Sequence, residues 1–300
     1  MTAAGRAASV RRRVRLARGP VTIGEPAAVI EARLASGEPY RPDTVADGGE
    51  AFGLTVLAAS VRGLSKRYTG GPRQDDICLR LHADSGTLVA AVADGVSGAS
   101  RSDLGAALAV RYATAAVARQ LDDRCASVDW GPVFEHAAWA LVEEHRRASG
   151  DASAGVDEAG RSLATTLLVA AVRGSDVQVA AVGDSPAFVL AGKEYDSVVG
   201  SPPESADGLV GGGVESLPRF GGADAVQAAR RQLDRGSVLL LCTDGLALPL
   251  AGGTGEVGLA LARELARPPD VVDFARLLDF SRSTYDDDRS LIAVWGPGSS

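Results

Sequence analysis

Apolar, β-branched runs alternate along the chain with segments whose apolar positions recur every three or four residues. Short apolar runs bounded by Gly, Asp or Ser predict buried strands, and the longer helical periodicity predicts amphipathic helices. Strands are expected at residues 54–61, 77–82, 87–93, 163–172, 177–182, 187–190, 237–242 and 291–295. Helices are expected at residues 102–121, 132–147, 223–233, 256–266 and 271–281. This order predicts one α+β domain with two packed sheets rather than a repeating βαβ unit.

Three segments lack such periodicity. Residues 1–50 are rich in Arg, Ala, Gly and Pro, and we expect a partly disordered extension there, with the folded domain at residues 51–300. Residues 149–161 read as a polar loop. Residues 194–220 are irregular and glycine-rich, which in a compact domain is typical of a functional loop.

Composition narrows the class of protein. An apolar fraction of 46% with 23% charged residues is typical of a globular chain, and the net charge of −7 argues against non-specific nucleic-acid binding. The three cysteines, Cys78, Cys125 and Cys242, are far apart and form no CxxC pair, which favours a cytoplasmic location over a disulfide framework or structural zinc. No apolar run approaches the length of a membrane span, so we expect no stable membrane insertion.

The most informative polar residues are aspartates beside apolar runs. Asp94 follows the run at 87–93, Asp244 follows 237–242, Asp75 precedes 77–82, and Asp287 precedes 291–295. Burying a carboxylate is costly unless it is paired or binds a cation. Aspartates that converge from strand ends without nearby His or Cys are the hard oxygen ligands that suit Mg²⁺ or Mn²⁺. Asp-Gly is also a common turn pair, and turn chemistry is the alternative explanation.

The order and spacing of these motifs resemble the metal-dependent, type-2C Ser/Thr protein phosphatases, in particular a bacterial subgroup. The resemblance covers residues from about 55 to 296 and rests on six segments in the family's order. They are Pro72-Arg73-Gln74-Asp75, Val92-Ala93-Asp94-Gly95-Val96-Ser97-Gly98, Ala164-Thr165-Thr166, Val182-Gly183-Asp184-Ser185, Leu241-Cys242-Thr243-Asp244-Gly245-Leu246 and Asp287-Asp288-Arg289-Ser290. The fold that this implies is a four-layer α-β-β-α sandwich, in which two mainly antiparallel sheets are flanked by helix pairs.

The resemblance also implies roles. Asp94 would bridge two Mn²⁺ or Mg²⁺ ions, and Asp244 and Asp287 would hold the first. The Gly95 carbonyl would bind the second, on which Asp75, or Gln74 beside it, would act through water. A water bridging the ions would then attack phosphoserine or phosphothreonine, which makes Asp94, Asp244 and Asp287 the expected catalytic residues. Supporting hydrogen bonds are expected from Gln74, Asp76, Asp184 and Asp288.

Several positions depart from the family pattern. Val96 replaces a histidine that eukaryotic members use as an acid. Gly70 stands where an arginine often grips the phosphate, so Arg73 and Lys66 are the candidate phosphate ligands. Arg161 stands where many bacterial members carry an aspartate for a third metal ion.

The leading hypothesis is a cytoplasmic phosphoprotein phosphatase, opposed by a Ser/Thr kinase. The departures keep open a catalytically weak, phosphoprotein-binding regulatory module. The unassigned 194–220 segment keeps open a hydrolase of small phosphate esters.

Overall fold

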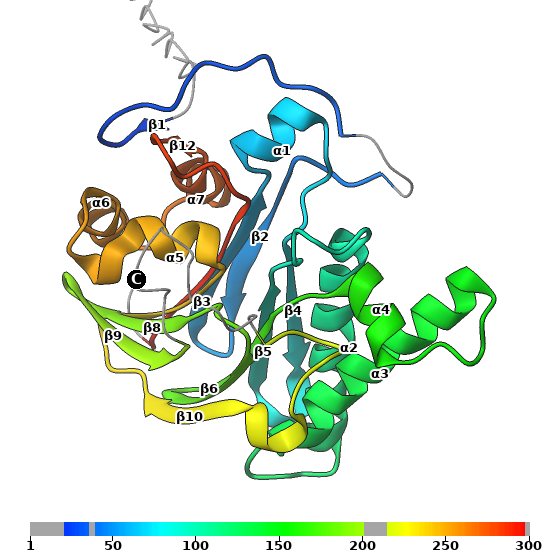
Figure 1. Ribbon diagram of the computed structural model, residues 1–300. Helices are drawn as coiled ribbons and strands as arrows, with labels where there is room; N and C mark the ends of the chain where they lie inside the picture. The colour runs from blue at the N-terminus through cyan, green and yellow to red at the C-terminus, as the bar shows by residue number, and fades with distance from the viewer. Residues whose placement is uncertain (1–20, 36–39, 201–214, 298–300) are drawn as a thin grey trace, which may run out of the picture.

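Two antiparallel sheets packed face to face form the centre of the molecule, and helices cover both outer faces (Figure 1). The computed structural model describes residues 21–35, 40–200 and 215–297. The resulting α-β-β-α layering is the fold expected from the sequence.

The first sheet has five strands in the order β10-β7-β6-β5-β4. Their bounds are β10 Gln227–Gln232, β7 Asp176–Val182, β6 Leu167–Arg173, β5 Thr87–Ala93 and β4 Asp76–His82. The second sheet has six strands in the order β2-β3-β13-β11-β8-β9. Their bounds are β2 Thr44–Ala51, β3 Leu54–Val61, β13 Arg289–Trp295, β11 Ser237–Cys242, β8 Ala187–Ala191 and β9 Glu194–Val199. A short parallel pair joins β1, Val21–Thr22, to β12, Phe280–Ser281.

The core between the sheets is aliphatic and contains many alanines. Central strands such as β5 and β11 are buried along their whole length, because one face meets the other sheet and the other face meets helices. Alternate residues therefore belong to different clusters: Val89 and Ala91 pack under the helices, whereas Leu88 and Ala90 pack between the sheets. Burial on both faces explains why these strands read as continuous apolar runs rather than as an alternation.

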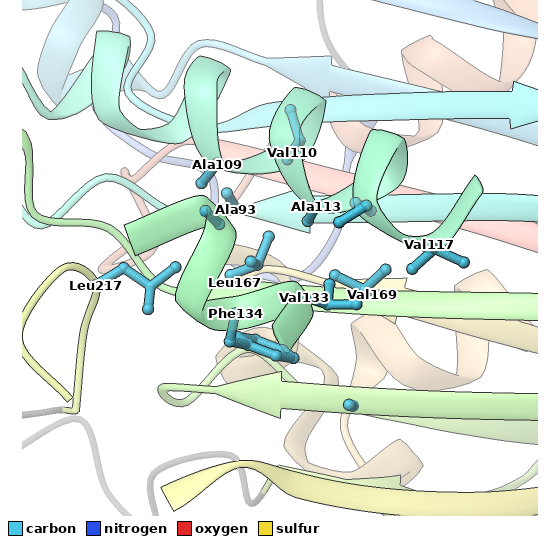
Figure 2. Close-up of a cluster of buried hydrophobic side chains, with 14 of the residues drawn as sticks. Ala93, Ala109, Val110, Ala113, Val117, Val133, Phe134, Leu167, Val169 and Leu217 are labelled. Atoms are coloured by element: carbon cyan, nitrogen blue, oxygen red, sulfur yellow. The ribbon is translucent and has the colours of Figure 1, made fainter. Parts of the chain in front are cut away.

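Helices α2, Ser102–Asp122, α3, Trp130–Ser149, and α4, Val156–Leu163, lie on the side of the five-stranded sheet. Figure 2 shows the cluster there, where Val110 and Val117 of α2 and Phe134 of α3 meet Leu167 and Val169 of β6.

The outer face of the six-stranded sheet is covered by α5, Asp244–Leu250, α6, Glu256–Glu264, and α7, Val271–Leu278. A short helix, α1, Leu64–Thr69, follows β3. Three 3₁₀ turns complete the described elements, at Ala83–Ser85, Gly222–Ala225 and Ala251–Gly253.

The helix expected at residues 223–233 is wrong. After one 3₁₀ turn the chain forms β10, which pairs along its length with β7 as an edge strand. Its Ala, Arg and Gln residues favour helix locally, but pairing with β7 overrides that preference. Two other expectations also need correction: α4 lies within the segment read as a polar loop, and β9 begins the segment read as irregular. Residues 201–214 of that segment lie outside the described residues.

The domain boundary expected at residue 50 is also wrong, because it falls inside the β2–β3 hairpin. Strand β2 pairs with β3 from Thr44↔Val61 to Ala51↔Leu54. The segment 21–35 then lies against β12 and α1 (Figure 1). The hairpin was missed because β2 is largely exposed and therefore lacks an apolar pattern. Residues 1–20 of the expected extension lie outside the described residues.

In the described parts of the chain, no single helix has the length and apolar character needed to cross a membrane. Taken together, the helical segments Asp244–Gly253 and Glu256–Glu264 would have the required length and apolar character, but the pair is bent by 92°. Its apolar residues pack beneath the six-stranded sheet.

Candidate functional site

Strand register brings the four aspartate motifs to the same end of the sandwich. Asp76 pairs with Ala93 across β4 and β5, which places Asp75 beside the chain that continues into Asp94. Cys242 pairs with Leu291 across β11 and β13, which places Asp244 near the residues that precede β13. Residues from distant parts of the chain thus meet where strands end.

Asp94 and Asp244 form a hydrogen-bonded carboxyl pair. Burial, followed by repulsion from Asp75 and Asp244, raises the pKa of Asp94 well above its usual range. Burial also raises the pKa of Asp244, and repulsion from Asp287 adds to it. Two carboxyl groups can share a hydrogen bond only when one is protonated, so this pair favours holding a proton or a cation between its members.

Asp287 and Asp184 lie near the Asp94–Asp244 pair, and we call these four aspartates the acidic group. Asp287 is exposed, its Oδ1 accepts the Asp288 amide at 2.9 Å, and its charge raises the pKa of both Asp94 and Asp244. Asp184 is half-buried, and burial followed by repulsion from Asp244 raises its pKa. Each of these carboxyl groups therefore lies within electrostatic range of Asp244.

Asp288 acts as a structural bridge. It is 2% exposed, and its two oxygens accept the amides of Gly63 at 2.7 Å and Gln74 at 2.6 Å. Gln74 in turn donates from Nε2 to Ser102 Oγ at 2.8 Å. These bonds join the chain after β3, the chain before β4 and the start of α2 to the Asp287 loop.

Asp75 is the most enclosed of the aspartates, at 1% exposed. Its Oδ2 accepts hydrogen bonds from Thr243 Oγ1 at 2.7 Å and Ser290 Oγ at 2.8 Å. Burial, followed by repulsion from Asp288, raises its pKa. Asp76, one residue later, pairs with Arg41 at 2.9 Å.

Hydroxyl groups that sequence reasoning did not assign hold the site together. Thr166 Oγ1 accepts the Asp94 amide at 3.1 Å and shares a hydrogen bond with Ser185 Oγ at 2.9 Å. Thr165 Oγ1 donates to the Asp94 carbonyl at 2.8 Å. The signal in the sequence is a Ser or Thr inside the motifs at residues 164–166, 182–185, 241–246 and 287–290, but only the fold shows which acceptor each hydroxyl serves.

Two glycines allow the motifs to approach this closely. A Cβ on Gly245 would lie 2.0 Å from the Asp288 carbonyl oxygen. A Cβ on Gly95 would lie 2.8 Å from the Gln74 carbonyl oxygen. Any side chain at either position would separate segments that carry the carboxylates.

Arg73 does not offer the free guanidinium expected of a phosphate ligand. It is 2% exposed, donates to Ser60 Oγ at 2.7 Å and to the Asp75 carbonyl, and lies 3.6 Å from Asp76. Burial lowers its pKa. Because Arg73 is buried and its Nη1 donates to the Asp75 carbonyl, it holds the Asp75 segment in place.

Lys66, on α1, is half-buried, and its charge acts to lower the pKa of Asp288. It therefore lies near the acidic group.

The donor set fits divalent cations in its chemistry. The group offers hard carboxylate oxygens, and a cation would relieve the repulsion that raises the aspartate pKa values. Within the described ranges, however, no group of three or more His, Cys, Asp or Glu side chains is arranged to hold a metal ion.

Comparison with solved structures supports the fold. Serine/threonine phosphatase Stp1 from Staphylococcus aureus matches with a TM-score of 0.56 at 15% identity, covering 90% of this chain and 100% of that one. PppA, a regulatory component of T6SS in Pseudomonas aeruginosa, matches with a TM-score of 0.55 at 18% identity, covering 83% and 99%. A bacterial serine phosphatase matches with a TM-score of 0.55 at 15% identity, covering 80% and 96%.

A search of curated proteins found no match. The sequence profile of the protein phosphatase 2C family, in contrast, matches residues 62–288, which include Asp75, Asp94, Asp244 and Asp287. Together with the sandwich fold, this match shows that the chain belongs to the protein phosphatase 2C family.

Proposed function

We propose that the protein is a Mn²⁺- or Mg²⁺-dependent phosphatase that hydrolyses phosphoserine or phosphothreonine in protein substrates. The observation that carries this proposal is the meeting of Asp94, Asp244 and Asp287 from three separate strand ends, where repulsion from Asp244 and Asp287 helps to raise the pKa of Asp94. Such a costly arrangement suits a protein that binds cations there.

Asp94, Asp244 and Asp287 would hold two ions, with the Gly95 carbonyl and Asp75 beside them. When bound, the ions would neutralise the phosphoryl oxygens and acidify a water molecule. The chain's own task is positioning: Asp288 anchors the Asp287 loop, Thr165 and Thr166 fix the backbone of Asp94, and Thr243 and Ser290 orient Asp75. Lys66 is the remaining candidate to contact the phosphate.

The biological setting follows from this chemistry. A phosphatase of this kind reverses the action of a Ser/Thr kinase, so the partners would be a phosphorylated protein and, indirectly, that kinase. A cytoplasmic location agrees with three free cysteines.

The test is turnover of a phosphoserine peptide by the purified chain, measured as released phosphate during a Mn²⁺ titration. We expect activity that rises with Mn²⁺ and is lost on addition of EDTA. A matched reaction with nucleotides and sugar phosphates separates a protein phosphatase from a hydrolase of small phosphate esters. Turnover unaffected by EDTA would contradict the proposal.

A catalytically weak phosphoprotein-binding module is the second candidate. Two observations favour it: Arg73 is buried, with its Nη1 bonded to Ser60 and to the Asp75 carbonyl, and Val96 cannot supply a proton to a serine leaving group. This candidate predicts phosphopeptide binding without phosphate release at any concentration of Mn²⁺ or Mg²⁺.

A further inference from the structure

The N-terminal strap, which we define as residues 21–35, runs beside the loop that leads into Asp287 (Figure 1). Its backbone is tied to this loop at several points. The Ala27 amide donates to Ser281 Oγ at 3.0 Å, and the Ser283 amide donates to the Glu25 carbonyl at 2.8 Å. The strap is therefore fixed to the segment that leads into Asp287.

Hydrogen bonds from the backbone hold the strap in place, but apolar side chains do not fill the space beneath it. A cavity of about 390 Å³ separates the strap from α1 and from the loop at residues 282–286. The residues that line it are Ala27, Ala28, Ile30, Leu64, Ser65, Tyr68, Thr69, Arg282, Ser283, Thr284 and Asp286. Its floor is therefore aliphatic, and its rim is polar.

The rim carries one charge that is not paired. Arg282 is neutralised by Glu256 at 2.7 Å. Asp286 is exposed, and its carboxylate has no ion-pair partner among the residues that the structure describes. The rim therefore carries one uncompensated negative charge, that of Asp286.

We propose that this cavity binds a lysine or arginine side chain of the phosphoprotein substrate, an inference that rests on the proposed phosphatase function. The aliphatic stem of a long basic side chain packs against Ala28, Ile30 and Leu64, and its charged end reaches Asp286. An uncharged apolar side chain fills the same floor but leaves Asp286 without a partner. The net charge of −7 favours a basic partner as well.

The distance along the substrate is short. Consecutive Cα atoms such as those of Asp286 and Asp287 are about 3.8 Å apart, and an extended peptide rises about 3.3 Å per residue. Because Asp286 is the chain neighbour of Asp287, the basic residue is expected close to the phosphoserine in the substrate sequence, and a scan of flanking positions measures that spacing.

Binding is measured by fluorescence anisotropy with peptides that contain a difluoromethylene phosphonate in place of the phosphoserine phosphate, which prevents turnover. One lysine is moved through the flanking positions, and each peptide has a norleucine counterpart with the same stem but no charge. We expect the lysine peptide to bind the wild-type chain about two- to fivefold more tightly at one position, as a partly exposed ion pair allows.

Asp286→Asn should reduce this ratio to about one. Asp286→Lys should reverse it, so that a glutamate peptide binds more tightly than the lysine peptide. Asp224→Asn is the matched control, because Asp224 is exposed and lies on the 3₁₀ turn before β10, beside α3. Ala28→Trp, which adds a large side chain to the cavity lining, should abolish the preference for lysine over norleucine.

Equal binding of the lysine and norleucine peptides at every position overturns the cavity proposal, whatever the activity of the protein. A wild-type chain that discriminates between the peptides but never releases phosphate contradicts the proposed function and leaves the cavity proposal standing. The two failures are therefore distinguishable.

Discussion

At the scale of single residues, the carboxyl pair of Asp94 and Asp244 links stability to function. Asp94→Asn keeps the hydrogen bond to Asp244 but removes a carboxyl group that becomes charged above its raised pKa. We expect phosphatase activity to fall at least about 100-fold, since several kcal/mol of charge stabilisation in the transition state depend on this group. In EDTA, the melting temperature should instead rise, by about 2–4 °C per kcal/mol of relieved repulsion.

The pH dependence of stability checks the same pair. A carboxyl group whose pKa is raised by folding binds a proton more tightly in the folded state, so it stabilises the protein at low pH. This contribution is lost as pH rises through the folded pKa. Wild-type protein in EDTA should therefore gain stability as pH falls from neutral, and Asp94→Asn should gain less.

The activity prediction for Asp94→Asn has its own contradicting outcome. Near-wild-type turnover of Asp94→Asn at saturating Mn²⁺ would contradict the role given to Asp94.

At the scale of elements, close contact between the start of α5 and the chain before β13 positions Asp244. Gly245→Ala would place a methyl group against the Asp288 carbonyl, so one of the two segments must move. We expect a loss of about 1–3 kcal/mol in the free energy of unfolding, measured with urea, together with loss of activity.

Gly49→Ala is the control for that substitution. Gly49 lies in β2, and an added Cβ meets no atom within 4 Å. Its free energy of unfolding should stay the same or rise by about 0.5–1 kcal/mol, as expected for replacing glycine in a strand. Equal effects of the two substitutions would mean that the Gly245 contact does not constrain the site.

The hairpin of β2 and β3 belongs to the domain, and truncation tests this at the same scale. A chain that begins at residue 52 lacks β2 and also lacks Asp43, which lies 3.3 Å from the buried Arg62 and 2.7 Å from Arg67. We expect it to unfold at lower urea concentration than a chain that begins at residue 21, because a buried arginine loses its carboxylate. Identical unfolding midpoints would restore the boundary at residue 50.

At the scale of the whole molecule, metal binding should stabilise the fold. A ligand that binds only the folded state adds about 2.7 kcal/mol at a concentration 100 times its dissociation constant. The melting temperature should therefore rise with Mn²⁺ and return to its starting value in EDTA, whereas Asp94→Asn should respond weakly. A wild-type melting temperature that does not change with Mn²⁺ would contradict the metal assignment.

The number of ions is a separate prediction. We expect calorimetric titration to give two ions per chain, because Arg161 stands where a third carboxylate would be and its own charge pairs with Glu158 at 3.1 Å. Arg161→Asp is the variant that should add a weaker third site. A third ion bound to the wild-type chain would contradict this expectation.

Local pattern in the sequence was enough for most strands and helices. Strands β5 and β11 begin and end where their apolar runs do, since residues buried on both faces must be apolar. The aspartates that follow these runs were found for the same reason. Strand β10 and the exposed β2 were missed because their strand conformation depends on pairing with β7 and β3, which lie elsewhere in the chain.

The sequence by itself determined which residues carry charge at strand ends and, through the family resemblance, the layered sandwich. Only the tertiary structure decided how each charge is used. Arg73 is turned inward because Ser60 and the Asp75 carbonyl lie next to it, and Asp288 is a bridge because the Gly63 and Gln74 amides point at it. The cavity under the strap exists because residues 21–35 lie beside residues 280–286. Hydrogen bonds and burial depend on which distant segments meet, and that is a property of the folded chain.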